Sequence, residues 1–229
     1  MADIGIVMLD NRIPRPPGDV GNAASFPFPV AMAVSIGAGT RQVVENHAAG
    51  LLPAITATVK ELADGGAPAV TTCCGFLAVF QQELADSVEV PVATSSLLQV
   101  PLVLQTLRQD QALCVLTANA ATLTDAHLRA VGIGADLRPR VHLAGLERTE
   151  HLYPVLTGEI ENLDVARAEG EVVAVARAAT GERPEIGAFV FECTNLPPYA
   201  AAVRAATGRP VWDALSLIGW LRAGVRGSC

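Results

Sequence analysis

The chain has 229 residues, of which 51% are hydrophobic and only 17% are charged. This composition excludes a disordered chain and allows one large α/β domain or two smaller ones that share a core. The net charge of −7 and the 4% of aromatic residues offer no basic surface for nucleic acid or an anionic membrane, and few rings on which bases stack.

Strand-like and helical patterns alternate along the chain. Ile4 to Leu9 is a short apolar run that predicts a buried strand, and residues 11–29 follow as a long loop rich in Pro and Gly. Long loops in compact domains are often functional, although an irregular surface excursion explains this one equally well. Further strands are expected at 70–72, 90–93, 112–117, 141–144, 188–191 and 210–213. Apolar spacing predicts helices at 51–62, 77–85, 95–108, 119–131, 163–179, 198–206 and 215–222.

The alternation indicates parallel sheets with both faces covered by helices. The strand signals divide near Val100 into two βα halves of similar make. No signal peptide begins the sequence, and no apolar run reaches the roughly 20 residues of a membrane span. We therefore expect a cytoplasmic protein that does not enter a membrane and whose five cysteines are reduced.

Two of these cysteines, 119 positions apart, each follow a buried strand and precede a turn into a helix. They are Cys74, followed by Gly75-Phe76, and Cys193, followed by Thr194-Asn195. Ligand sites in parallel α/β sheets lie at such strand ends, where backbone N–H groups bind carboxylates and lower the pKa of a thiol. A single cysteine at such a place is more often a small apolar filler. The matched pair, however, predicts proton transfer on both faces of one carbon.

Neighbouring residues limit which groups take part. Successive strand residues point to opposite faces, so only one of Cys73 and Cys74 is expected at the site, and Gly75 favours Cys74 because the backbone can turn closely around a ligand there. Glu192 either orients or polarises the adjacent thiol or is an outward-facing strand-end carboxylate. The sole lysine, Lys60, lies on the polar side of a helix and offers pyridoxal no anchor.

No other cofactor is indicated by the sequence. The four histidines show no metal-ligand spacing with each other or with the cysteines, and no glycine-rich phosphate loop is present. We therefore expect neither a cofactor nor a metal.

Two segments, Thr71-Thr72-Cys73-Cys74-Gly75-Phe76 and Glu192-Cys193-Thr194-Asn195-Leu196-Pro197, resemble the two cysteine motifs of the cofactor-independent aspartate/glutamate/hydantoin racemase superfamily. Val115-Leu116-Thr117-Ala118 is similar to the segment that opens the second lobe in those enzymes. The strand–helix order agrees from about residue 3 to 222. The chain departs from glutamate racemases at Asn195, where they have histidine, and at Leu9-Asp10-Asn11, where they have an Asp-Ser pair.

The resemblance implies an α/β fold of two pseudo-symmetric lobes, each a parallel sheet flanked by helices, with the active site in the cleft between them. The first lobe is expected to comprise residues 1–99 plus 214–229, and the second lobe residues 100–213. Cys74 and Cys193 would be the acid/base pair. The expected substrate-binding residues are Asn11, Gly75, Phe76, Thr117, Thr194 and Asn195.

The function implied is that of a cofactor-independent racemase, an isomerase that transfers protons at the α-carbon of an amino acid or related carboxylate. A maleate-isomerase-like or arylmalonate-decarboxylase-like reaction on the same scaffold is the alternative, although the presence of two cysteines disfavours the decarboxylase. A non-catalytic protein that binds a small carboxylate is the alternative from another class. The expected partner is a small-molecule carboxylate substrate, and a homodimer or higher homo-oligomer is the default assembly.

Overall fold

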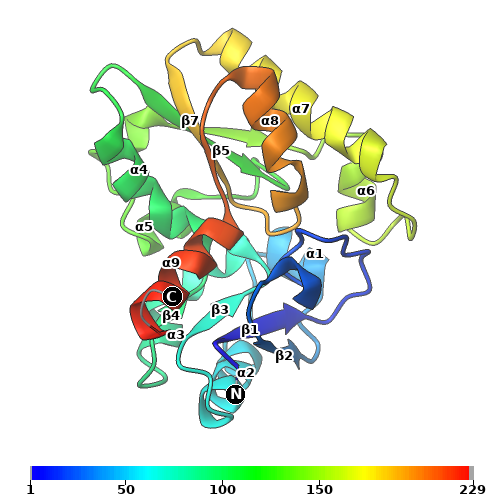
Figure 1. The fold of residues 1–229 in the computed structure, drawn as a ribbon, viewed down its shortest axis with the longest axis vertical. Helices are drawn as coiled ribbons and strands as arrows, with labels where there is room; N and C mark the ends of the chain where they lie inside the picture. Colours follow the sequence, from blue (N-terminus) through cyan, green and yellow to red (C-terminus); the bar gives the residue numbers. More distant parts are fainter. Residues whose placement is uncertain (1, 227–229) are drawn as a thin grey trace.

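Two four-stranded parallel sheets, one above the other in Figure 1, form the framework of the computed structural model, which describes residues 2–226. The first sheet has the order β2-β1-β3-β4, and its strands are Ile4–Leu9 (β1), Val30–Ser35 (β2), Val70–Thr72 (β3) and Val92–Ala93 (β4). The second has the order β6-β5-β7-β8, and its strands are Ala112–Thr117 (β5), Val141–Gly145 (β6), Ile186–Phe191 (β7) and Val211–Trp212 (β8). The two orders are equivalent, which confirms the predicted two-lobed α/β class.

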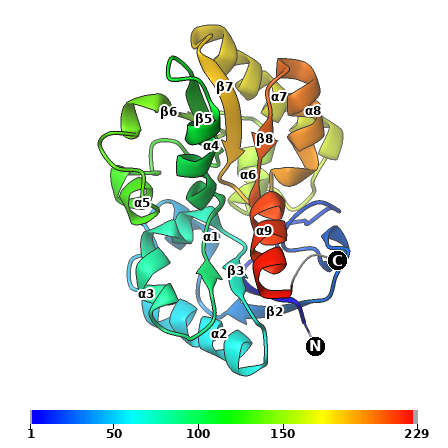
Figure 2. The same cartoon turned by 60° about the vertical axis from the view of Figure 1, so that its left-hand side comes forward.

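Helices flank both sheets (Figures 1 and 2). They are Thr40–Val44 (α1), Leu52–Asp64 (α2), Gln81–Ala85 (α3), Val100–Thr106 (α4), Asp125–Ala130 (α5), Leu152–Leu156 (α6), Val165–Glu182 (α7), Ala200–Thr207 (α8) and Ala214–Arg226 (α9). Short 3-10 turns lie at Ala23–Ser25, Gly75–Phe80, Ser96–Gln99, Arg138–Arg140 and Pro197–Tyr199. No helix in residues 2–226 is long and apolar enough to cross a membrane.

The strands at the centre of each sheet form the core. Every residue of β5 and β7 is buried, as expected for strands covered on both faces. Edge strand β2 is only partly buried, and its run of small and apolar residues directly after Pro27 and Pro29 gave no clear strand signal in the sequence. The short helices α1 and α6 were also not predicted, because five residues are too few to show a helical period.

The end of the chain returns to the first lobe. Helix α9 follows β8 but runs alongside the first lobe in Figures 1 and 2, and Arg222 Nε donates to Asp3 Oδ2 at 2.8 Å. The expected lobe boundaries, 1–99 plus 214–229 and 100–213, stay a prediction. Residues 227–229, including Cys229, lie outside the described part of the chain.

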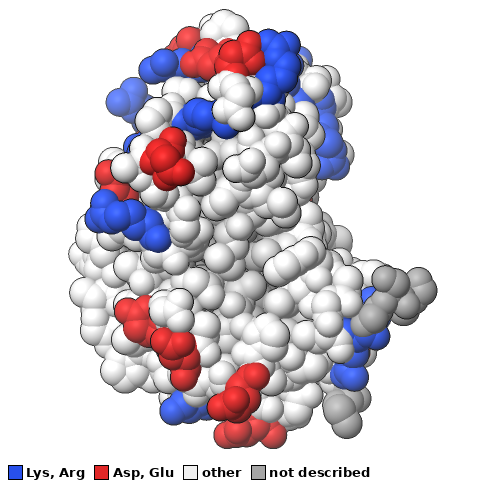
Figure 3. All heavy atoms as spheres, turned by 90° about the vertical axis from the view of Figure 1, so that its left-hand side faces the viewer, with Lys and Arg blue, Asp and Glu red and all other residues white. Residues whose placement is uncertain are grey.

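Figure 3 shows a face with charged side chains toward its two ends and a largely uncharged middle. A hollow of about 600 Å³ lies between α4 and α9, two helices that occupy this side in Figure 1. Leu102 and Trp220, which line the hollow, are 64% and 68% exposed. The small fraction of charged residues in the chain, 17%, is thus accompanied by an apolar surface between α4 and α9.

Candidate active site

A cavity of about 30 Å³ lies where the carboxyl ends of the central strands of both sheets meet. Segments that follow β1, β3, β5 and β7 all contribute to it. Its lining is Leu9, Asn11, Ile13, Arg15, Thr40, Val44, Cys73, Cys74, Gly75, Phe76, Ala118, Leu156, Glu192, Cys193, Thr194 and Asn195. A space of this size holds roughly one water molecule. The lobes are therefore closed on each other in this structure.

Cys74 and Cys193 line this cavity from opposite lobes. Cys74 follows β3 in extended backbone, and Cys193 follows β7. Burial raises the pKa of the Cys74 thiol well above its usual value, and the Glu192 carboxylate raises it further. Burial and then Glu192 also raise the pKa of Cys193, whose thiol lies 3.6 Å from Asn195 Oδ1. Both groups are held as thiols, and each becomes a strong base once it loses its proton.

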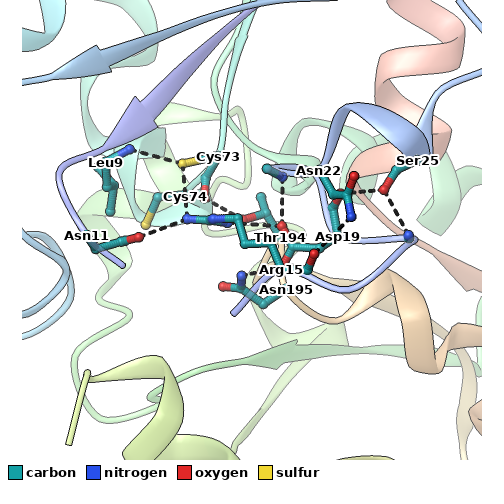
Figure 4. Close-up of polar contacts among 12 residues, drawn as sticks. Leu9, Asn11, Arg15, Asp19, Asn22, Ser25, Cys73, Cys74, Thr194 and Asn195 are labelled. Carbon is teal, nitrogen blue, oxygen red and sulfur yellow. Dashed lines mark hydrogen bonds and ion pairs between the residues drawn. The ribbon is translucent and has the colours of Figure 1, made fainter. Parts of the chain in front are cut away.

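Cys73 lines the same cavity, contrary to the expectation that only one of the two neighbouring cysteines reaches it. Its sulfur accepts a hydrogen bond from the backbone N–H of Leu9 at 3.1 Å and lies 3.9 Å from Arg15 Nη2 (Figure 4). Burial raises the pKa of Cys73, while Arg15 and the Leu9 N–H oppose this rise. Cys73 and Cys74 therefore differ in electrostatic setting, one beside a cation and the other beside a carboxylate.

Arg15 reaches the cavity from the Pro-rich segment 11–29. Figure 4 shows its guanidinium between Asn11 and Cys73 on one side and Asp19 on the other. It donates to Asp19 Oδ1 at 3.0 Å and to Asn11 Oδ1 at 3.2 Å. Among the described residues that line the cavity, it is the one Lys or Arg side chain. The segment predicted as a long loop rich in Pro and Gly thus supplies the site with its positive charge.

Asp19 ties the Pro-rich segment to the second lobe. It is 0% exposed, and its carboxylate accepts from Arg15, from the Gly21 N–H at 2.7 Å and from the side-chain amide of Asn195. A buried carboxylate needs such partners to offset its loss of hydration. This network fixes Arg15 and Asn195 relative to each other.

Glu192 lies at the carboxyl end of β7 and is 0% exposed, so it is not an outward-facing strand-end carboxylate. Thr117 donates its hydroxyl hydrogen to Glu192 Oε2 at 2.7 Å. Glu192 Oε1 has no hydrogen-bond partner among the described residues. Burial raises the pKa of Glu192 to about 7, against which the Thr117 hydrogen bond acts.

Gly75 allows the two lobes to meet closely at this point. A Cβ atom placed on Gly75 would lie 2.3 Å from both the carbonyl oxygen and Oε1 of Glu192, far inside van der Waals contact. The glycine is therefore required by the approach of a carboxylate on the other lobe.

The residues expected to bind substrate mostly gather at this cavity. Five line it, namely Asn11, Gly75, Phe76, Thr194 and Asn195. Thr117 does not line it and instead lies behind Glu192 as its hydrogen-bond donor. The Thr194 hydroxyl donates to the carbonyl of Cys73, so this side chain is engaged in joining the lobes. Their roles toward a substrate stay predictions.

Sequence reasoning missed Arg15 and Asp19. A charged pair with i, i+4 spacing inside a Pro-rich loop is a weak signal, and Arg12 in the same loop offered an equal candidate. No group of three or more His, Cys, Asp or Glu side chains in residues 2–226 is arranged to hold a metal ion.

The two lobes, with a site between them, have the fold of the cofactor-independent racemase superfamily. The model resembles an unliganded arylmalonate decarboxylase (TM-score 0.58, 15% identity, 99% of this chain and 93% of the other). It also resembles an aspartate racemase from Picrophilus torridus (TM-score 0.57, 14% identity, 97% and 92%). A glutamate racemase from Bacillus anthracis is similar too (TM-score 0.58, 14% identity, 96% and 82%). At these identities the likeness shows the fold alone.

Relatives found by sequence similarity identify the family of the chain, which the solved structures do not. A dimethylsulfoniopropionate lyase from Durusdinium sp. clade D is 32% identical over 222 residues, which cover 93% of this chain and 72% of that protein. Dimethylsulfoniopropionate lyase 5 from Emiliania huxleyi (strain CCMP1516) is 31% identical over 96% of this chain, which spans only 45% of its length. No family model matches the chain. The chain belongs to the dimethylsulfoniopropionate lyase family.

This membership overturns the predicted function. The expected racemase is an isomerase, whereas the relatives at 31–32% identity are lyases, so the predictions of a racemase activity and of the isomerase class are wrong. The fold prediction held because the scaffold is shared. One scaffold hosts several reactions, and the reaction depends on pocket details that the cysteine motifs do not encode.

Proposed function

We propose that this chain is a lyase that cleaves dimethylsulfoniopropionate into dimethyl sulfide and acrylate. The observation that carries the proposal is the 32% identity to a dimethylsulfoniopropionate lyase across 93% of the chain. The inter-lobe cavity offers the groups that this chemistry needs.

The proposed substrate is a small carboxylate with a sulfonium group on its β-carbon. Removing a proton from the α-carbon expels neutral dimethyl sulfide, so the elimination needs one base and no acid for the leaving group. The C–H electrons become the new double bond, and the C–S electrons leave with sulfur. A thiolate in a dry cavity suits this step, because burial makes it a stronger base than it is in water.

We assign the base to Cys193 and the carboxylate contact to Arg15. Arg15 is the cavity's guanidinium, a group whose N–H donors match a carboxylate, and a bound carboxylate would take over the donor that Nη2 now directs at Cys73. Arg15 also lowers the pKa of Cys193 against the larger effect of burial, so it favours the thiolate. Cys74 would close the opposite face of the α-carbon. Asn11 and Asn195, whose amides border Arg15 and Asp19, would hold the guanidinium in place.

The test is release of dimethyl sulfide from dimethylsulfoniopropionate by the purified chain, measured in the headspace. Cys193→Ser is expected to lower kcat by at least about 10²-fold, the size typical of a lost general base. Cys74→Ser should be milder, because an elimination needs one base where racemisation needs two. Cys114→Ala, inside β5 and away from the cavity, is the control. Absence of dimethyl sulfide from the wild type, or full activity of Cys193→Ser, would refute the proposal.

A further inference from the structure

One carboxylate of the site has no obvious structural purpose. Glu192 is completely buried, its Oε2 is engaged by Thr117, and its Oε1 is without a partner among the described residues. Buried polar atoms are normally paired, so an orphaned carboxylate oxygen calls for an explanation. Thr117 alone does not supply it, because one hydroxyl does not compensate a buried charge.

The position of Glu192 links it to both thiols. It directly precedes Cys193 on one lobe and packs against Gly75, the residue after Cys74, on the other. Its charge raises the pKa of each thiol. No ion pair of Glu192 with a lysine or arginine is present in the part of the chain that the structure describes, unlike Asp19, which is held by Arg15. Glu192 thus has Thr117 as its hydrogen-bond donor and lines the same cavity as Cys74 and Cys193.

The proposed elimination creates a need that a racemase does not have. Each turnover leaves one proton on the thiol that attacked the α-carbon, and no later step returns it to the product. A buried thiol with a raised pKa does not lose that proton readily by itself. The enzyme therefore needs an acceptor beside the thiol before it can act again.

We propose that Glu192 is this acceptor and restores the thiolate between turnovers. This inference rests on the proposed lyase activity. The thiolate first takes the α-proton as the C–H bond breaks, the double bond forms and dimethyl sulfide leaves. The S–H bond then breaks, an O–H bond forms at Glu192 Oε1, and the carboxyl releases the proton to water when the lobes open. Glu192 thus acts through the thiol and not on the substrate. Its raised pKa of about 7 suits exchange at neutral pH.

Glu192→Gln tests this role because glutamine keeps the shape and can still accept from Thr117. We expect a burst of about one dimethyl sulfide per active site, followed by a steady-state rate lowered by about 10²-fold. The rise of kcat through about pH 7, set by Glu192, should disappear. Loss of the burst together with the steady-state rate would place Glu192 in bond breaking and overturn the proposal, as would an unchanged pH profile.

A second measurement needs no turnover. The rate at which iodoacetamide alkylates the cavity thiols is followed against pH in the wild type and the variant. Removing the negative charge of Glu192 lowers the thiol pKa, so Glu192→Gln should be alkylated several-fold faster at alkaline pH. Glu171→Gln is the matched control, because this carboxylate caps the backbone N–H groups of His151 and Leu152 away from the cavity.

The two measurements separate the two proposals. Identical alkylation profiles for the wild type and Glu192→Gln would show that the carboxyl and the thiols are not coupled, and would overturn the role of Glu192. Coupled alkylation in a wild type that releases no dimethyl sulfide would overturn the lyase activity, while supporting proton exchange between Glu192 and the thiols.

Discussion

The hydroxyl of Thr194, at the carboxyl end of the second sheet, donates a hydrogen bond to the backbone carbonyl of Cys73 at the end of the first sheet. Both residues are almost completely buried. A second bond of the same kind joins Ser96 Oγ to the carbonyl of Phe191. The segments that carry the cysteines are therefore fastened to each other directly, and their geometry depends on these side chains.

Thr194→Val should destabilise the protein, because it leaves the buried carbonyl of Cys73 without its donor. The expected loss in the free energy of unfolding is about 1–3 kcal/mol, measured by urea denaturation. Thr194→Ser keeps the hydroxyl and is the control, with a much smaller loss. Equal stabilities of the two variants would contradict the importance of this bond.

Gly75→Ala should disturb the site more than a methyl group usually does. Its Cβ would collide with Glu192 at 2.3 Å, so the lobes or the carboxylate must shift, at a cost of about 1–3 kcal/mol and with loss of activity. Gly170→Ala in α7 is the matched control, since nothing lies within 4 Å of its added Cβ. That variant should gain about 0.5–1 kcal/mol. Thermal unfolding of both variants decides the matter.

Glu192 also predicts how stability depends on pH. Its pKa is raised to about 7 in the folded state and returns to an ordinary value of about 4.3 on unfolding. Between these values the folded protein holds a proton that the unfolded chain has lost, so the free energy of unfolding falls as pH rises from about 4.3 to 7. The loss is on the order of 3 kcal/mol.

Glu192→Gln should remove this slope. The stability of the variant relative to the wild type is expected to grow from pH 5 to pH 7 and then level off, as measured by urea denaturation at each pH. Working with this difference cancels the opposite effect of His127, whose pKa burial lowers to about 4. A constant difference across the range would argue against a raised pKa of Glu192.

The mouth of the cavity offers another prediction. A hollow of about 380 Å³ adjoins the cavity and shares Asn11, Ile13, Thr40 and Leu156 with it. The ion pair of Arg41 with Glu159 bridges the two lobes beside this hollow. Because the cavity is too small for a substrate, we expect this contact to break when the substrate enters.

Glu159→Gln should therefore make opening easier. An exposed ion pair contributes up to about 1 kcal/mol, so alkylation of the cavity thiols should become about two- to five-fold faster. Glu150→Gln, which removes an exposed ion pair with Arg167 within the second lobe, is the control and should leave the rate unchanged. Equal rates for the two variants would show that the bridge does not restrain the mouth.

The fold was largely predictable from the sequence because buried central strands leave continuous apolar runs, as in Ile4–Leu9 and Ile186–Phe191. The position of Cys74 and Cys193 at the cavity was predictable because each closely follows a buried strand, whereas their chemical roles stay predictions. Edge strand Val30–Ser35 was missed because it is half exposed and its sequence follows two prolines. Arg15 and Asp19 were missed because a loop has no period from which the direction of a side chain follows. The reaction was missed because a racemase and a lyase can share the same thiols.

The site draws its charged group and its thiols from two different kinds of structure. The thiols proposed to act directly follow strands that the cores of both lobes hold in place. The charge proposed to bind the substrate lies on a segment without strands, held by Asp19 and Asn195. Changes within residues 11–29 can thus alter which molecules are accepted while the strands that precede the thiols stay in place. Proteins of this fold that accept a different substrate should therefore differ first in the sequence of that segment.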